Sequence, residues 1–196
     1  MQAARGTSLS DDATPDQAPA TDPAARRRLW FRFAAVALVV YAVDIATKVL
    51  AVAKLTDRDD IPLVGDLLVL HLTRNPGAAF STGTQFTEVL SCIAIVAVVV
   101  VLWLSRRIGT AAWAVGLGLL LAGVAGNLTD RLLREPGPLR GHVIDFLMLP
   151  NWPVFNIADM AINAAAALIL IQAFRGVHID GTRERHVDDE TQEPTT

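Results

Sequence analysis

The sequence is dominated by four long apolar runs, which cover roughly residues 33–53, 87–104, 111–128 and 154–174 of its 196 residues. A helix needs about 20 apolar residues to cross a bilayer, and these runs are continuous rather than alternating like a strand or confined to one helix face. Over the whole chain 52% of the residues are apolar and only 19% are charged, which is unlike an ordinary soluble domain. The runs therefore predict four transmembrane helices.

The segment between the first two runs is too polar to cross a membrane. Within residues 57–86, the stretch LLVLHL and the turn sequence Asn75-Pro76-Gly77 are typical of one or two short strands that end in a turn. We therefore expect an all-α membrane protein with four transmembrane helices and a small extracytoplasmic segment that contains β-strands.

Both ends of the chain are polar and acidic. Residues 1–25 carry a net charge of −3 and residues 176–196 carry −4, so the rest of the chain is +4 although the whole sequence is −3. Segments with so few large apolar residues cannot bury enough surface to offset the entropy lost on ordering. We expect a disordered N-terminal tail over 1–28, a four-helix membrane domain over 29–175 and a disordered acidic C-terminal tail over 176–196.

Basic residues indicate how the helices are oriented. Arginines flank the start of the first run, fill the short link between the second and third runs, and follow the fourth run: Arg26, Arg27, Arg28, Arg106, Arg107 and Arg175. Since positive charge stays on the cytoplasmic side, we expect both termini in the cytoplasm and the segments 54–86 and 129–153 outside it. Three tryptophans then mark the inner membrane face and one the outer face: Trp30, Trp103 and Trp113, and Trp152.

Small residues predict where two of the helices touch. Gly118, Ala122 and Gly126 are spaced four apart in the third run, which places them on one helix face. Faces of this kind let the backbone of a neighbouring helix approach closely in a membrane. The alanine run 164–167 predicts a similar contact in the fourth run.

A few polar residues lie within or beside the runs, where a charged group costs on the order of 3 kcal/mol on insertion scales. Asp44 and Lys48 are four residues apart in the first run, which suits either a structural ion pair or a functional site. Others gather near the predicted outer face: Asn127, Asp130 and Arg131 at the end of the third run, Asn156 and Asp159 at the start of the fourth, and Asp145 in GHVIDF between them. The predicted orientation thus brings three carboxylates to one membrane face.

Several chemistries lack the residues that they need. The four histidines have no metal-ligand spacing, Ser81 and Ser91 have no Lys or His partner at a recognisable spacing, and the single Cys92 excludes an internal disulfide and a Cys-based zinc cluster. The sequence has no phosphate-binding glycine loop and no basic, aromatic surface for nucleic acid.

Paired carboxylates remain. Two nearby Asp groups can share a proton, so that one activates a water as general base while the other donates to a substrate carbonyl, without a cofactor. The residue pattern alone does not decide which of the three outer carboxylates would form such a pair.

Five segments resemble, in order, the signature blocks of the lipoprotein signal peptidases, also called signal peptidase II: VDIATK (43–48), RNPGAAFS (74–81), GNLTDR (126–131), HVIDF (142–146) and FNIADMAI (155–162). The resemblance implies a membrane aspartic endopeptidase that removes the signal peptide from bacterial prolipoproteins, cutting N-terminal to a cysteine modified with diacylglycerol. It implies an active site at the extracytoplasmic face of the bacterial cytoplasmic membrane.

The resemblance assigns the catalytic pair to Asp145 and Asp159. It assigns supporting or substrate-binding roles to ten further residues: Asp44, Lys48, Asn75, Gly77, Asn127, Asp130, Arg131, Phe155, Asn156 and Ala158. The expected partners are diacylglyceryl-prolipoproteins and membrane lipid, with no cofactor, metal or nucleic acid, and the chain is expected to be monomeric. The stretch 132–144 is longer than in many relatives, which predicts an extra outer loop.

A different interpretation is a small proton-coupled transporter in which intramembrane Asp44, Lys48, Asp130 and Asp159 form a relay. A relay should extend towards both membrane faces, whereas the inner halves of all four runs are nearly free of ionisable groups. A purely structural membrane scaffold would leave the three carboxylates at one face unexplained. The sequence therefore favours the peptidase.

Overall fold

The computed structural model describes residues 22–77 and 85–184. Its elements, in chain order, are α1 (Pro23–Leu55), β1 (Ile61–Val64), β2 (Leu68–Asn75), α2 (Gln85–Leu104), the short 3-10 helix η1 (Ser105–Arg107), α3 (Ala111–Leu133), β3 (Val143–Met148) and α4 (Ile157–Phe174). Each of the four α-helices is long and apolar enough to cross a membrane. The predicted fold class is confirmed, because a small three-stranded antiparallel sheet accompanies these helices.

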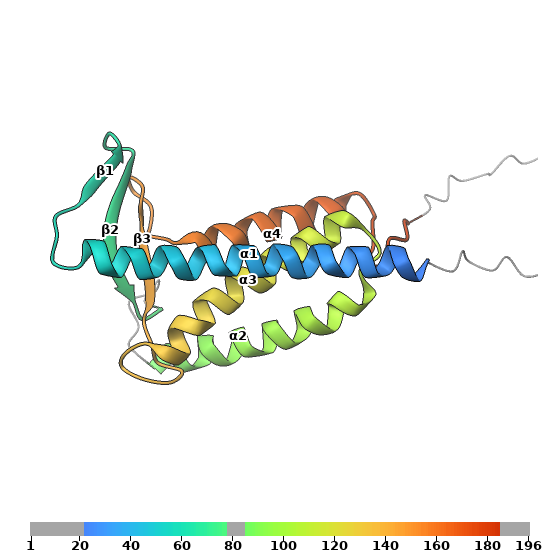
Figure 1. Ribbon diagram of the computed structural model, residues 1–196, viewed down its shortest axis with the longest axis horizontal. Coiled ribbons are helices and arrows are strands. Elements are labelled where there is room, and N and C mark those ends of the chain that lie inside the picture. Colours follow the sequence, from blue (N-terminus) through green and yellow to red (C-terminus); the bar gives the residue numbers. More distant parts are fainter. Residues whose placement is uncertain (1–21, 78–84, 185–196) are drawn as a thin grey trace, which may run out of the picture.

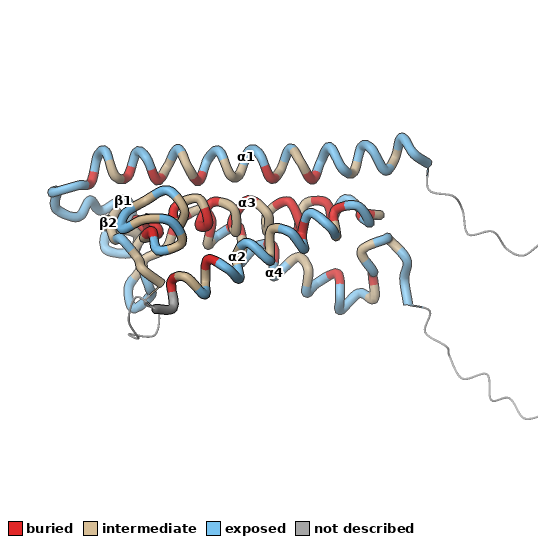
Figure 2. Tube along the Cα trace, turned by 90° about the horizontal axis from the view of Figure 1, so that it is seen from below, coloured by how far each residue is buried: buried red, intermediate tan, exposed pale blue. Residues whose placement is uncertain are grey.

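The helices form a bundle with the sheet at one end. In Figure 1 the sheet lies at the left, and both described chain ends lie at the opposite end of the bundle. Helix α3 occupies the centre, since it packs against α1, α2 and α4. It also has the largest share of buried residues, as the red segments of Figure 2 show. The outer faces of the other helices expose apolar side chains, as expected where lipid replaces water.

Helix α1 begins about ten residues earlier than the first apolar run. Its first turn is capped by Asp22, whose side chain accepts a 2.9 Å hydrogen bond from the backbone N–H of Ala24. Pro23 follows at the first helical position, where its fixed φ and missing N–H are tolerated. The prediction of a disordered tail is therefore wrong for residues 23–28, because these capping residues start a helix before the apolar run.

The chain after α4 folds back on the bundle. Val177 is buried, and its carbonyl accepts a 3.0 Å hydrogen bond from the indole N–H of Trp113. Ile179 packs against the same apolar cluster. The predicted disorder of the C-terminal tail is wrong for 176–184, because these two apolar side chains anchor the segment, while 185–196 lie outside the described residues.

Strand β3 was expected to be part of an outer loop. It pairs with β2 in the register Thr73 to Asp145 and Asn75 to Val143. Because side chains alternate along a strand, Ile144 packs on α1 while Asp145 points to the other face. Pairing with β2 thus fixes a carboxylate whose position the sequence left open.

The predicted stripe of small residues on α3 lies against α1. A Cβ atom at Gly118 would come within 2.9 Å of the backbone oxygen of Phe33. A Cβ atom at Gly126 would collide with the carboxylate of Asp44 and lie 3.4 Å from the Cβ of Ala158 on α4. The glycines therefore let three helices meet closely beside the buried polar residues.

Candidate active site

Asp145 is a buried carboxylate on β3. Its Oδ2 accepts a 2.9 Å hydrogen bond from the side-chain amide of Asn75, and its Oδ1 accepts one of 2.6 Å from that of Asn156. Burial raises the pKa of Asp145 to about 6; the amide of Asn75 opposes this rise, the charge of Asp159 adds to it, and Asn156 and Lys48 oppose it. The group therefore changes its protonation close to neutral pH.

Asp159 lies in the first turn of α4, where it forms a reciprocal capping box with Asn156. The side-chain oxygen of Asn156 accepts from the backbone N–H of Asp159 at 3.0 Å, and Oδ2 of Asp159 accepts from the backbone N–H of Asn156 at 3.1 Å. Oδ1 of Asp159 accepts a 2.8 Å hydrogen bond from the side-chain amide of Asn127. The partial positive charge of the helix N-terminus stabilises negative charge at this position.

Asn156 connects the two carboxylates. It is fully buried, its side-chain nitrogen donates to Asp145, and its backbone nitrogen donates to Asp159. The preceding residue, Phe155, exchanges two 2.9 Å backbone hydrogen bonds with Leu147 of β3. The start of α4 is thus tied to β3 by both backbone and side chain, which holds the two carboxylates in a fixed relation.

Lys48 on α1 has a fully buried side chain near this pair. Its Nζ is 2.9 Å from Oδ2 of Asp44 and 3.0 Å from Oδ2 of Asp130, so two carboxylates surround one ammonium group. Nζ also donates a 3.0 Å hydrogen bond to the side-chain oxygen of Asn127. The predicted ion pair between Asp44 and Lys48 is therefore present, and it joins a network that reaches Asp159 through Asn127.

Asp44 and Asp130 also bind backbone groups near the carboxylate pair. Oδ1 of Asp44 accepts a 2.9 Å hydrogen bond from the backbone N–H of Ala158, which satisfies a free donor of the first turn of α4. Oδ2 of Asp130 accepts one of 3.2 Å from the backbone N–H of Ile144, and its Oδ1 forms an ion pair with Arg134. Both carboxylates are therefore committed to cations and to the backbone.

Charge compensation separates the three outer carboxylates. Asp130 pairs with Lys48 and Arg134, whereas within residues 22–77 and 85–184 no cation lies within 4.0 Å of the carboxylate oxygens of Asp145 or Asp159. Among the described residues, the side chains that donate hydrogen bonds to Asp145 and Asp159 are uncharged amides. Two nearby carboxylates that lack an ion-pair contact are suited to share a proton, which makes Asp145 and Asp159 the candidate pair.

The remaining predicted residues lie around this pair. Asn75, at the end of β2, accepts a 2.8 Å hydrogen bond from the backbone N–H of Gly77, whose φ of +95° suits glycine. Arg131 is half-buried on α3 and interacts electrostatically with Asp159, Asp145 and Asp130. Its buried Nε has no hydrogen-bond partner in the part of the chain that the structure describes. Arg131 therefore has a free donor close to the carboxylate pair.

Two residues that shape the site were not predicted from the sequence. Arg134 neutralises Asp130 and follows it by four residues in the chain, a spacing that could have revealed the pair. Ile144 supplies backbone groups to both Asp130 and Asn156, a contribution for which the sequence carried no signal. Gly126, which the spacing of small residues did predict to lie at a helix contact, makes room for Asp44.

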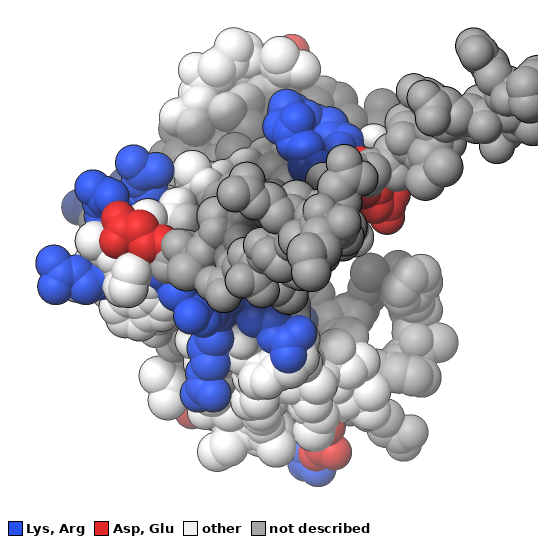
Figure 3. Space-filling view, turned by 90° about the vertical axis from the view of Figure 1, so that its right-hand side faces the viewer, with Lys and Arg blue, Asp and Glu red and all other residues white. Residues whose placement is uncertain are grey.

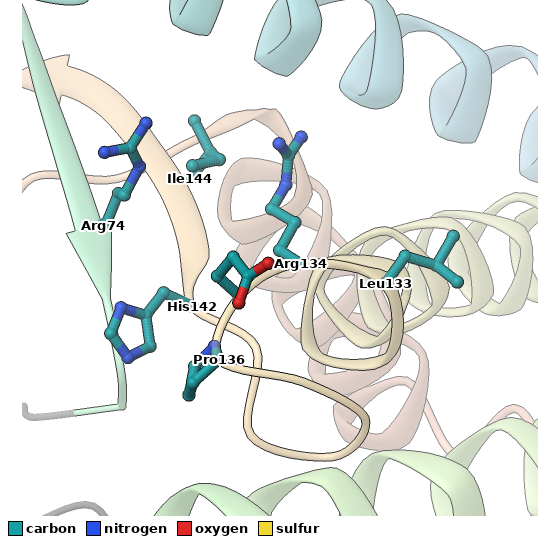
Figure 4. A pocket seen from close by; sticks show the side chains of 7 residues that line it. Arg74, Leu133, Arg134, Pro136, His142 and Ile144 are labelled. Carbon is teal, nitrogen blue, oxygen red and sulfur yellow. The ribbon is translucent and has the colours of Figure 1, made fainter.

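A cavity of about 600 Å³ lies beside the site, and Ile144 is part of its lining. Arg74 on β2 and His142 ahead of β3 lie on one side of it, and Leu133 and Arg134 at the end of α3 lie on the other (Figure 4). Neither Asp145 nor Asp159 is part of its lining. Among the described residues, no group of three or more His, Cys, Asp and Glu side chains could hold a metal ion.

Comparison with known proteins gives a consistent result. Residues 36–175 match the Peptidase A8 family, described as signal peptidase (SPase) II. The chain is 43% identical over 185 residues to the lipoprotein signal peptidase of Mycobacterium avium. The aligned region covers 94% of this chain and all of that protein. It is 46% identical over 166 residues to that of Mycobacterium tuberculosis H37Rv, covering 85% and 82%. A solved bacterial membrane enzyme is 25% identical, with a TM-score of 0.63 over 76% of this chain and 92% of that one.

Proposed function

The chain belongs to the signal peptidase II family, and from this membership we propose that it removes signal peptides from prolipoproteins as an aspartic endopeptidase with Asp145 and Asp159 as its catalytic pair. It is a membrane-embedded peptidase with four spanning helices. The proposed bond is the one N-terminal to a cysteine that carries diacylglycerol. The proposed substrates are diacylglyceryl-prolipoproteins, cleaved by a monomer without metal or cofactor.

The observation that carries the proposal is the bridge made by Asn156. One residue donates to both carboxylates, through its side chain to Asp145 and through its backbone to Asp159. Neither carboxylate has a cation within ion-pair distance among the described residues, whereas Asp44 and Asp130 do. Such a pair can hold a single proton between its two members and activate water by itself.

In the proposed reaction, Asp159 takes a proton from a water whose oxygen attacks the scissile carbonyl carbon. Asp145 donates its proton to the carbonyl oxygen, giving a neutral tetrahedral diol. When this intermediate collapses, the C–N bond breaks, the nitrogen takes the proton held by Asp159, and a hydroxyl proton returns to Asp145. Atoms and charges balance, and both side chains regain their starting protonation.

Two features support Asp145 as the group that starts with the proton. Its burial raises its pKa to about 6, which favours the neutral acid relative to an ordinary carboxyl. Asp159 accepts two N–H donors at a helix N-terminus, an environment that stabilises a carboxylate. Arg131, with its free Nε, is proposed to bind a backbone carbonyl of the substrate.

The proposed location is the cytoplasmic membrane of a bacterium, with both termini in the cytoplasm and the active site outside. Both described chain ends lie at the end of the bundle opposite the sheet (Figure 1), and this end carries most of the exposed arginines of the helices. Positive charge of this kind is retained in the cytoplasm. The carboxylate pair would then lie at the outer boundary of the bilayer, where a diacylglyceryl group holds a substrate.

Cleavage of one prolipoprotein with and without its diacylglyceryl group tests the proposal. The full chain, purified in detergent, should cut only the lipidated form, and mass spectrometry of the products should place the cut before the modified cysteine. The same assay with EDTA should give an unchanged rate. Equal cleavage of the unlipidated form would contradict the substrate class, and loss under EDTA that zinc restores would contradict the aspartic mechanism.

A further inference from the structure

A second cavity lies at the opposite end of the bundle from the carboxylates. It has a volume of about 470 Å³ and opens between the first turns of α1 and the 3-10 helix η1. Its lining comprises Pro23, Arg26, Arg27, Trp30, Ser105, Arg106 and Ile108. Three of these residues are arginines and none is acidic, so the part of the lining that the structure describes carries positive charge only.

A neighbouring cavity shows that this imbalance is specific. That cavity, of about 430 Å³, shares Arg26 and Ile108 with the first, but its lining also contains Asp22 and Asp180. Basic and acidic side chains therefore face each other there. Within the described residues, no carboxylate lies within 4.0 Å of the guanidinium groups of Arg27 or Arg106, in contrast to Arg28, which is 3.7 Å from Asp22.

Two of the three arginines that line the cavity make contacts that hold their side chains in place. The guanidinium group of Arg26 donates to the backbone carbonyl of Arg106, which ties η1 to α1. The guanidinium group of Arg27 lies 5.8 Å from the ring centroid of Phe31, one turn further along α1. Arg26 is thus supported by a backbone carbonyl and Arg27 by an aromatic ring, and no acidic side chain of the described residues forms an ion pair with either.

Aromatic residues place the cavity at the membrane surface. Trp30 and Trp103 are 48% and 50% exposed, on helices that are long and apolar enough to cross a bilayer. Exposed tryptophans of this kind lie at the level of lipid headgroups. Figure 3 views this end of the molecule and shows basic side chains predominating over acidic ones around it.

We propose that this cavity binds the phosphate group of an anionic membrane phospholipid. Arginine forks bind phosphate oxygens in pairs, and Trp30 would contact the adjoining glycerol and acyl segments. Basic pockets between membrane helices recognise lipid headgroups in the same way. The proposed function enters only in deciding that this lipid belongs to the cytoplasmic leaflet; the binding itself is independent of the catalytic pair.

Lipid binding to the purified full chain tests the inference, with cardiolipin and phosphatidylcholine as probes in detergent. The double variant Arg27→Gln/Arg106→Gln removes two charges from the cavity and leaves the carbonyl that Arg26 binds. The control Arg32→Gln/Arg175→Gln removes two exposed charges from the same end of the bundle without touching the lining. Native mass spectrometry and the rise in Tm on lipid addition give the affinity.

We expect the cavity variant to bind cardiolipin about tenfold more weakly than the wild type, and the control to lose less than about threefold. Equal loss in both variants would overturn the inference, since diffuse surface charge would then explain binding. A Tm rise with inorganic phosphate as large as that with cardiolipin would overturn the lipid assignment. If the double variant does not fold, the single exposed charge reversal Arg27→Glu is expected to weaken binding by a similar factor, and unchanged binding would refute the proposal.

Discussion

The ammonium group of Lys48 donates a 3.0 Å hydrogen bond to the side-chain oxygen of Asn127. Because that oxygen faces Lys48, the amide nitrogen of Asn127 faces Asp159, to which it donates at 2.8 Å. Lys48 therefore helps to determine which end of the Asn127 amide meets the proposed catalytic carboxylate, together with the side-chain amide of Asn156, which donates to the same oxygen at 3.2 Å. It is a positioning residue, since it acts on Asp159 through Asn127.

Replacing Lys48 by methionine should impair both stability and catalysis. The change leaves Asp44 and Asp130 buried without their shared cation, which is expected to lower the free energy of unfolding by about 3–5 kcal/mol. It also removes the charged donor that orients the Asn127 amide and leaves the weaker contact from Asn156, so we expect kcat to fall about tenfold with little change in KM. Denaturation monitored by circular dichroism and steady-state cleavage of a lipidated peptide measure the two effects.

Lys54→Met is the matched control for this experiment. Lys54 is exposed on the same helix and does not take part in the site, so its substitution should leave both stability and kcat near the wild-type values. A folded Lys48→Met protein with wild-type kcat would contradict the positioning role.

Two substitutions at Asn156 separate its capping role from its contact with Asp145. Asn156→Ser keeps a side-chain oxygen for the cap of α4, whereas Asn156→Ala removes it, so the alanine variant should be less stable by about 1 kcal/mol. Both variants lose the amide that donates to Asp145. We therefore expect kcat to fall roughly 10- to 100-fold in each. If instead the serine variant has near wild-type activity and only the alanine variant loses it, activity depends on the helix cap and not on the amide contact with Asp145.

The pH dependence of cleavage should report the protonation of Asp145. Its pKa is raised to about 6, so the proton that it is proposed to donate is lost as pH rises through that value, and kcat/KM should fall on the alkaline side. The folded state binds this proton more tightly than the unfolded chain, so the associated stability is also lost as pH rises from about 4 through 6.

Asn75→Ala removes a hydrogen bond that lowers this pKa, so the alkaline limb of the profile should move to higher pH. The exposed Asn163→Ala on α4 serves as the control and should leave the profile in place. A shift of the limb to lower pH in the Asn75 variant would contradict the assignment.

Glycine at position 126 should be required for the close approach of three helices. A methyl group there would collide with the carboxylate of Asp44, so Gly126→Ala is expected to lower the free energy of unfolding by about 1–3 kcal/mol and to reduce activity. Gly116 lies on the same helix, where an added Cβ would make ordinary contacts of 3.5 Å with Ile169. Gly116→Ala should therefore be neutral or slightly stabilising. Equal thermal stability of the two variants would refute the packing argument.

The helices and the inter-helix contact were predictable because they depend on local composition. Apolar runs identified all four spans, and the spacing of Gly118 and Gly126 identified the face of α3 that packs on α1. The start of α1 and the folded segment 176–184 were missed, because a helix cap and two apolar side chains outweigh a polar composition. Strand β3 was missed because its partner β2 is about 70 residues away in the sequence.

The gathering of the carboxylates near one end of the bundle was likewise predictable, but their different roles were not. The buried charged residues among those described are Asp44, Lys48, Asp130 and Asp145, all near the sheet end of the bundle, which does not suit a proton relay across the membrane. The residue pattern alone gave no reason to prefer Asp145 and Asp159 over Asp130. That distinction depends on Lys48, which reaches Asp130 from another helix only in the folded protein, and on Arg134, whose spacing of four residues from Asp130 was overlooked.

The most direct test of the catalytic pair is the cleavage rate of a diacylglyceryl-prolipoprotein by Asp145→Asn and by Asp159→Asn, with the exposed Asp66→Asn as control. Each substitution keeps the shape of the side chain and removes its ability to exchange a proton. We predict that both variants insert and fold, that each loses activity by about 10³-fold or more, and that the control cleaves at the wild-type rate. Near-normal cleavage by either folded variant at position 145 or 159 would contradict the proposed mechanism.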